Sequence, residues 1–340
     1  MKIDGFLTAM LCAVGLAVLA PSLGAAGGPL HVGLLTEIGI AAVFFLHGAE
    51  LSTKALKAGA ANWRLHLFVH ASTFVLFPAI GFVIFTATRG FLSPEVRLGI
   101  FYLCALSSTI SSSVAMTSLG RGNVPGAVFD ATLSGLLGMV LTPLLMGLVS
   151  VAGAKPIPLG PAVVDVALKL LAPFVAGHLL RPVIGALVHR HKPLVMRADR
   201  SVIVLIVYGA FCESSAAGLW SRYSVATIAE IFVAVALLLA LVLTATTWGA
   251  RAAGFSREDE VAAVFCGSKK SLANGAPIAK ILFGATPSLG MIVLPLMLYH
   301  QLQLIVCSAL ARRYAARAEA EAGLGATDRA APPAVAEAAA

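Results

Sequence analysis

The sequence predicts an all-α polytopic membrane protein with about ten transmembrane helices, and three observations support this fold class. Hydrophobic residues make up 59% of the 340 residues and charged residues only 12%, whereas soluble domains carry about a quarter charged residues. The 32 glycines fit membrane helices, in which glycine is common. Apolar segments of about 20 residues, enough to span a bilayer, recur along the chain. This composition excludes a soluble enzyme and a disordered regulator, and the arginines are too scattered to form a nucleic-acid-binding patch.

Ten segments of the chain are predicted to span the membrane. They cover residues 5–24, 32–50, 65–87, 97–119, 126–150, 161–188, 200–220, 226–249, 260–283 and 289–311. Most connections between them are short and carry the charged residues. The five cysteines lie inside apolar stretches without paired spacing, which indicates buried free thiols and no metal site.

Lysine and arginine placement predicts the orientation of these spans. Sixteen of the 24 lysines and arginines fall on the side of the N-terminus, four fall on the opposite side and four lie inside spans. The positive-inside rule then places both termini in the cytoplasm of a multi-pass inner (plasma) membrane protein. A cleaved signal peptide over residues 1–26 is the alternative, and its removal would leave nine spans.

The chain divides into two similar halves, residues 1–150 and residues 151–313, followed by an expected disordered cytoplasmic tail over residues 314–340. Each half has five spans, an odd number, so the second half enters the membrane in the inverted orientation. Polar residues interrupt the fourth span at 107–113 and the ninth at 267–277. Matching interruptions in inverted repeats indicate the substrate site of a transporter.

Lys269 and Lys270 are the first candidate site residues, because a charge inside a membrane costs about 2.5–3.5 kcal/mol and needs a partner or a wet cavity. Asp130, near the start of the fifth span, is the preferred partner, since that span directly follows the first interruption. Its alternative role is to cap the cytoplasmic end of its own helix. Glu213, at the outer end of the seventh span, is either a cavity acid or an interfacial one.

Hydroxyl groups in the interruptions supply the other candidates. Six hydroxyls within residues 107–113 exceed what is needed to bond carbonyls one turn back. Such oxygens suit a hard cation or a polar substrate. We therefore expect Ser112 and Ser113, with Ser268 and Asn274 from the second interruption, to bind substrate or ion.

Two further patterns have less support as sites. His66 and His70 lie four residues apart on one helix face, as in some zinc sites, but no third ligand is near and packing at the membrane boundary is preferred. Ser268 followed by Lys269 has the composition of a hydrolase dyad, but adjacent helical residues point about 100° apart. We predict no metal site, no catalytic residue and no enzyme activity.

Residues 43–52 (VFFLHGAELS), 65–68 (LHLF), 265–272 (FCGSKKSL) and 294–301 (LPLMLYHQ) resemble the bile acid:sodium symporter family. The resemblance covers nearly all of residues 5–313. More narrowly, it is to the SBF-like branch, with bacterial sodium-dependent transporters and eukaryotic regulators of calcium influx. It implies a panel domain of spans one, two, six and seven. It also implies a core domain in which the fourth and ninth helices cross where they unwind.

The sequence departs from the family at the sodium site. Sodium-coupled members read roughly Glu-x-Gly-x-Gln-Asn at the ninth-span break, whereas alignment on Gly267 places Phe265 at the Glu, Lys269 at the Gln and Lys270 at the Asn. An ammonium and Na⁺ would repel each other strongly at that distance. We therefore expect a lysine amine to occupy the sodium's place, held by Asp130 and serine hydroxyls. Coupling would then be to protons, with a lysine as the switching group, or absent.

The expected function is secondary transport of a small organic anion across the inner membrane by alternating access. No cofactor is expected besides Na⁺ or H⁺ as a coupling ion, and the expected partners are the substrate anion and the lipid bilayer, with no nucleic acid. One alternative is a proton-coupled ion antiporter. The other is a non-transporting regulator of ion flux such as calcium.

Overall fold

The computed structural model describes residues 5–151, 158–218, 223–284 and 286–330, and within these ranges it contains helices and no strand. Six helices in these ranges are long and apolar enough to cross a membrane. Large apolar side chains such as Leu179, Val183 and Trp248 are exposed on the bundle surface, as expected where helices face lipid. The protein is therefore a polytopic membrane protein.

In the first half of the chain, helical elements occupy the predicted spans. α1 (Gly5–Leu19) and the short helix η1 (Pro21–Leu23) are followed by α2 (Val32–Glu50) and the short α3 (Thr53–Gly59). α4 (Trp63–Ala71), the π-helical turn η2 (Ser72–Leu76) and α5 (Phe77–Ala87) continue one another. α6 (Pro94–Ala105) and α7 (Ser111–Leu119) form an interrupted span, and α8 (Val124–Val151) completes the half.

The second half is also built of helices and contains one interrupted span. α9 (Leu159–Val166), the π-helical turn η3 (Ala167–Leu171) and α10 (Ala172–Arg190) continue one another, and α11 (Lys192–Ala216) and α12 (Val225–Ala252) follow. α13 (Arg257–Gly267) and α14 (Leu272–Phe283) form the second interrupted span, and α15 (Leu289–Ala330) is the last helix.

Serine side chains set several helix starts. Ser93 caps α6, whose first position is Pro94, a residue without a backbone N–H to satisfy. Ser224, Ser256 and Ser271 cap α12, α13 and α14 in the same way. These caps supply acceptors for N–H groups that have no partner within the helix.

The helix contacts can be divided into two groups, and α11 of the first also packs against α14 and α15 of the second. In one group α2 packs against α10 and α11, and α1 packs against α11. α2 and α10 approach backbone to backbone, because a Cβ added at Gly48 would collide with the Phe174 carbonyl and one at Gly177 with the Phe45 carbonyl. In the other group α6 packs against α5 and α15, and α13 against α7 and α12. The division into a panel domain and a core domain that the family resemblance implies stays a prediction.

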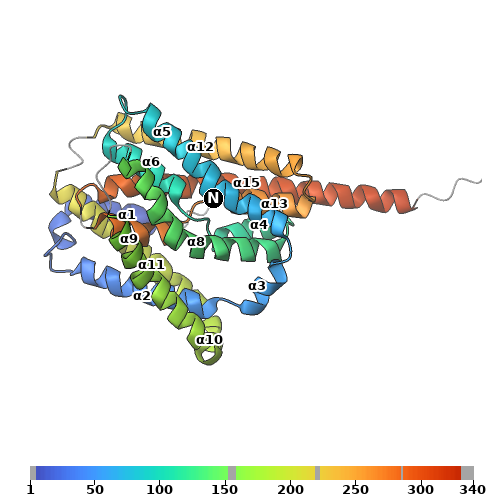
Figure 1. Ribbon diagram of the computed structural model, residues 1–340, viewed down its shortest axis with the longest axis horizontal. Coiled ribbons are helices and arrows are strands. Elements are labelled where there is room, and N and C mark those ends of the chain that lie inside the picture. Colours follow the sequence, from blue (N-terminus) through green and yellow to red (C-terminus); the bar gives the residue numbers. More distant parts are fainter. Residues whose placement is uncertain (1–4, 152–157, 219–222, 285, 331–340) are drawn as a thin grey trace, which may run out of the picture.

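The C-terminal helix continues past residue 313, where the sequence predicted a disordered tail to begin. α15 extends to Ala330 and leaves the bundle in Figure 1. Tyr314 and Ala318 are buried, and the Tyr314 hydroxyl donates to Oε1 of Glu260 at 2.8 Å. Residues 314–318 therefore still pack on the bundle, and residues 331–340 lie outside the described ranges.

Candidate functional site

The two interrupted helices cross at their breaks. The backbone N–H of Ser271 donates to the Ser107 carbonyl at 2.9 Å, and Asn274 Nδ2 donates to Ser107 Oγ at 3.0 Å. The breaks cover residues 106–110 and 268–271, which is less than the predicted 107–113 and 267–277. Ser112, Ser113 and Asn274 thus stand in the first turns of α7 and α14 and not in the unwound segments.

Lys270 lies at the centre of this crossing and is fully buried. Its Nζ donates to the carbonyls of Leu106 at 2.6 Å, Cys104 at 2.8 Å and Thr73 at 3.0 Å. It also lies 4.0 Å from the centroid of the Phe77 ring, which a cation favours. Because a carbonyl only accepts, three such bonds need three N–H groups, and only the ammonium form of lysine has three. The geometry therefore describes a charged Lys270.

Lys269 is also fully buried but has a different environment. Its Nζ donates to the Ser112 carbonyl at 2.8 Å and lies 5.6 Å from the centroid of the Phe265 ring. The two adjacent amines thus bond to opposite sides of the first break, with Lys270 on the α6 side and Lys269 on the α7 side. Together they join the ninth span to both parts of the fourth.

The serine hydroxyls bond mainly to protein groups at the crossing. Ser108 Oγ donates to the Cys266 carbonyl at 2.6 Å, and Ser113 Oγ donates to the Phe265 carbonyl at 3.1 Å. Ser268 Oγ bonds the Val264 carbonyl one turn back, and Ser112 Oγ pairs with the Thr109 hydroxyl. Ser108 and Ser113 therefore form hydrogen bonds with backbone carbonyls that lack helical partners near the breaks. Binding of substrate or ion by Ser112, Ser113, Ser268 and Asn274 stays a prediction.

Asp130 has a different partner from the lysine that the sequence predicted. It is fully buried on α8, and its Oδ1 lies 2.8 Å from Nδ1 of His66 and 3.8 Å from Nε2 of His70. Both lysine amines bond to backbone carbonyls instead. The predicted pairing of Asp130 with a lysine is therefore wrong. The broken helices supply enough carbonyl acceptors for both lysine amines, so no carboxylate is required beside them.

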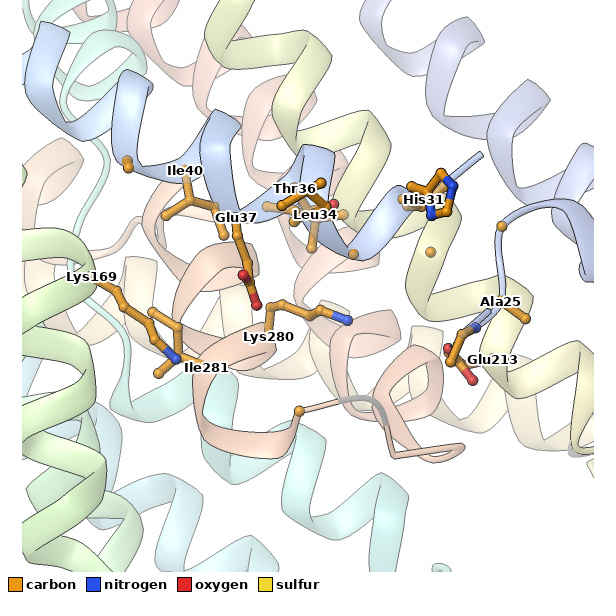
Figure 2. A pocket seen from close by; sticks show the side chains of 18 of the residues that line it. Ala25, His31, Leu34, Thr36, Glu37, Ile40, Lys169, Glu213, Lys280 and Ile281 are labelled. Carbon is orange, nitrogen blue, oxygen red and sulfur yellow. The ribbon is translucent and has the colours of Figure 1, made fainter. Parts of the chain in front are cut away.

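A cavity of about 700 Å³ opens between the two helix groups. α2, η3, α11 and α14 contribute lining residues, among them Glu37, Lys169, Glu213 and Lys280. Figure 2 shows Glu37, Lys169 and Lys280 pointing into the same space, with Glu213 further along it. Glu213 Oε1 accepts from the backbone N–H of Ala26 at 2.6 Å. Glu213 is thus a cavity acid, and it lies in a part of the molecule other than the lysine crossing.

Comparison with known proteins gives a family match. The model of the SBF-like CPA transporter family matches residues 4–316. The chain is 48% identical to "Uncharacterized protein PA2026" of Pseudomonas aeruginosa, over 92% of this chain and 93% of that protein. It is 47% identical to "Putative symporter YfeH" of Escherichia coli K12, over 84% and 85%. It is 30% identical to "Sodium/bile acid cotransporter 7" of Mus musculus, over 90% and 91%.

This chain belongs to the SBF-like CPA transporter family. The match confirms the resemblance stated from residues 43–52, 65–68, 265–272 and 294–301, and it makes the protein a membrane transporter of the SBF-like family. The lysine-bearing crossing described above is therefore part of a transporter fold.

Sequence reasoning missed several residues that build this SBF-like crossing. Gln303, fully buried on α15, accepts from the Lys270 backbone N–H and donates to the Lys270 carbonyl, both at 2.8 Å. Tyr299 donates to the Ser268 carbonyl at 2.7 Å and Tyr102 to the Gly275 carbonyl at 2.6 Å. A glutamine within an apolar span was the one available signal, since a buried amide needs partners on both of its sides.

Proposed function

We propose that the protein moves a small organic anion across the inner membrane by alternating access, without sodium. The observation that carries this proposal is the Lys270 ammonium, which uses all three N–H groups on three backbone carbonyls at the helix crossing. A tethered ammonium supplies there the positive charge that a bound Na⁺ would supply. A second cation beside it would be repelled in a site of low dielectric constant.

The cavity between the two helix groups supports an anionic substrate. The Lys169 and Lys280 side chains reach into it from η3, which packs against α2 and α10, and from α14, which packs against α11 and α15 (Figure 2). The two lysines can pair with an anion, because no ion pair within 4 Å involves either of them in the described part of the chain. Glu37 and Glu213 line the same cavity, so the anion would lie at the lysines and away from these carboxylates. Inverted five-helix repeats, panel and core, would open this cavity alternately to each side of the membrane.

Uptake into proteoliposomes tests this function. The purified full chain would be reconstituted and offered radiolabelled carboxylates of several sizes, from pyruvate and succinate to taurocholate, with NaCl outside or with choline chloride in its place. We expect saturable uptake of at least one of these anions, with rates in the two salts within about twofold of each other, because Lys270 holds the ion's place. Uptake that needs Na⁺ would contradict sodium independence. Absence of uptake for every anion would contradict anion transport and favour the antiporter or the regulator.

A further inference from the structure

A second buried cluster of titratable groups lies outside the lysine crossing, where α4, α8 and the end of α3 meet. The His66 ring lies between two partners, with Nδ1 at 2.8 Å from Asp130 Oδ1 and Nε2 at 2.9 Å from the Gly59 carbonyl. Asp130 is fully buried and His66 is 8% exposed. The Phe129 ring covers the imidazole, with ring centroids 4.2 Å apart. The cluster is therefore a built site and not a surface contact.

The partners of His66 fix the number of protons in the pair. The Gly59 carbonyl only accepts, so Nε2 of His66 carries a proton. The bond between Nδ1 and Oδ1 then needs one more proton, which belongs either to an imidazolium ring or to a protonated carboxyl group. In both cases the pair holds one proton more than a neutral histidine beside a carboxylate would hold.

His70 adds a second base beside the same carboxyl group. Its Nε2 lies 3.8 Å from Asp130 Oδ1, which is ion-pair distance but too long for a hydrogen bond. Within the described residues, neither ring nitrogen of His70 and not Oδ2 of Asp130 has a hydrogen-bond partner. Buried polar atoms without partners are costly. The ring nitrogens of His70 and Oδ2 of Asp130 can therefore still take part in a hydrogen bond or bind a proton.

The other charged groups on the elements around α8 are engaged or placed elsewhere. Lys269 bonds the Ser112 carbonyl and not Asp130. Most other charged side chains that the structure describes on these elements have partners elsewhere or are exposed. They are exposed Lys57 and Asp165, Arg64 on the Ala253 carbonyl, Glu95 with the Tyr223 hydroxyl, Arg97 on the Phe85 carbonyl, Arg257 with Glu258, Asp259 on Asn62 and Asn123, Glu260 with Arg251, Arg121 with Glu319, and the cavity residues Lys169 and Lys280. Among the residues that the structure describes, the two histidines are the groups that form ion pairs with Asp130.

Two sets of contacts connect this cluster to other parts of the molecule, one through α3 and one along α4. His66 bonds to Gly59 at the end of α3, the short helix between α2 of one helix group and α4 of the other. Along α4 and its continuation, His66, His70, Thr73 and Phe77 follow helical spacing, and the last two contact the Lys270 amine. A change at the cluster can therefore reach both the link between the helix groups and the helix crossing.

We propose that His66, His70 and Asp130 form a proton-binding site, in which one proton shared between His66 Nδ1 and Asp130 Oδ1 exchanges with water during the transport cycle. Loss of the proton removes one of the two hydrogen bonds that join α8 to α3 through His66. A role of this proton in driving transport rests on the proposed transport function. The existence of the proton-binding site does not depend on that function.

The shared proton is tested without any substrate. Histidine labelled with ¹⁵N, in the full chain in lipid nanodiscs, reports the protonation of each ring nitrogen, and infrared spectra report a protonated carboxyl group. We expect one or the other signal at about pH 6 to 7, and we expect it to disappear in both His66→Gln and Asp130→Asn. His191→Gln, at an exposed position between α10 and α11, should leave it unchanged. A spectrum with neither signal would overturn the proposal.

The coupling role is tested by uptake of whichever carboxylate the proteoliposome screen identifies. We expect wild-type uptake to change at least about fivefold between about pH 6 and pH 8, and His66→Gln and Asp130→Asn to flatten this to less than about twofold. Asp130→Glu keeps a carboxyl group and should keep the pH dependence, which separates protonation from misfolding. Unchanged pH profiles in the variants would overturn the coupling role. Absence of all uptake would instead contradict the transport function, while the spectra still decide the proton site.

Discussion

Lys270 shows how one side chain can bind the backbone carbonyls that a helix break exposes. The carbonyls of Cys104 and Leu106 belong to the C-terminal end of α6, where the helix dipole is negative and carbonyls lack helical partners. A cation is favoured at such a place whether it is free or tethered. A tethered cation avoids the entropy cost of capturing a free ion.

Truncation of this side chain should therefore create a need for an external cation. In Lys270→Ala three buried carbonyls lose their donor, and we expect uptake to fall at least about tenfold. Na⁺ or methylammonium should restore part of it, because either can enter the vacated space and contact the same carbonyls. The measurement is proteoliposome uptake with choline, sodium or methylammonium chloride.

A matched lysine variant controls for loss of charge in this measurement. Lys192→Ala removes an exposed amine at the start of α11 and should leave uptake within about twofold of wild type. Full uptake by Lys270→Ala in choline chloride would show that the tethered charge is dispensable.

At the scale of elements, the backbone N–H and C=O groups that lose their helical partners at the breaks form hydrogen bonds with side chains of other helices. Ala105 O accepts from the Thr142 hydroxyl, and the Ser108 N–H donates to Ser134 Oγ, both at 2.9 Å. With the tyrosine, glutamine and lysine bonds described above, α8 and α15 supply much of this pairing. Irregular backbone inside a membrane is stable only where such partners exist, so these two continuous helices support the broken ones.

The contact between α2 and α10 should be equally sensitive to side-chain size. Gly177→Ala places a Cβ against the Phe45 carbonyl, whereas Gly160→Ala on α9 meets nothing within 4 Å. Small residues allow such close helix packing in membranes. We expect Gly177→Ala to destabilise the protein by about 2 kcal/mol or more, measured as a lower unfolding temperature in detergent. Gly160→Ala is the control, and equal unfolding temperatures of the two variants would contradict the backbone contact.

At the scale of the whole molecule, the positions of the two helix breaks could be predicted from the sequence, whereas the side-chain contacts between distant helices could not. The hydroxyl run before Ser113 and the lysine motif at 267–272 marked both breaks, because polar residues are costly in a membrane unless the backbone needs them. The partner of Asp130 was not predictable in the same way. His66 was noticed only with His70, and its contact with a residue 64 positions away depends on how α4 and α8 pack. Gln303 was missed for the same reason.

The placement of lysines and arginines predicts which side of the membrane each connection faces. Sixteen lysines and arginines on the side of the termini, against four on the other side, favour cytoplasmic termini. Of the five cysteines only Cys12 is exposed, so a Cys12→Ala background carries few reactive thiols. Gly90→Cys, in the connection between α5 and α6, should react with a membrane-impermeant maleimide on intact cells. His191→Cys, between α10 and α11, should react only after permeabilisation, and the reverse labelling pattern would place both termini outside the cytoplasm.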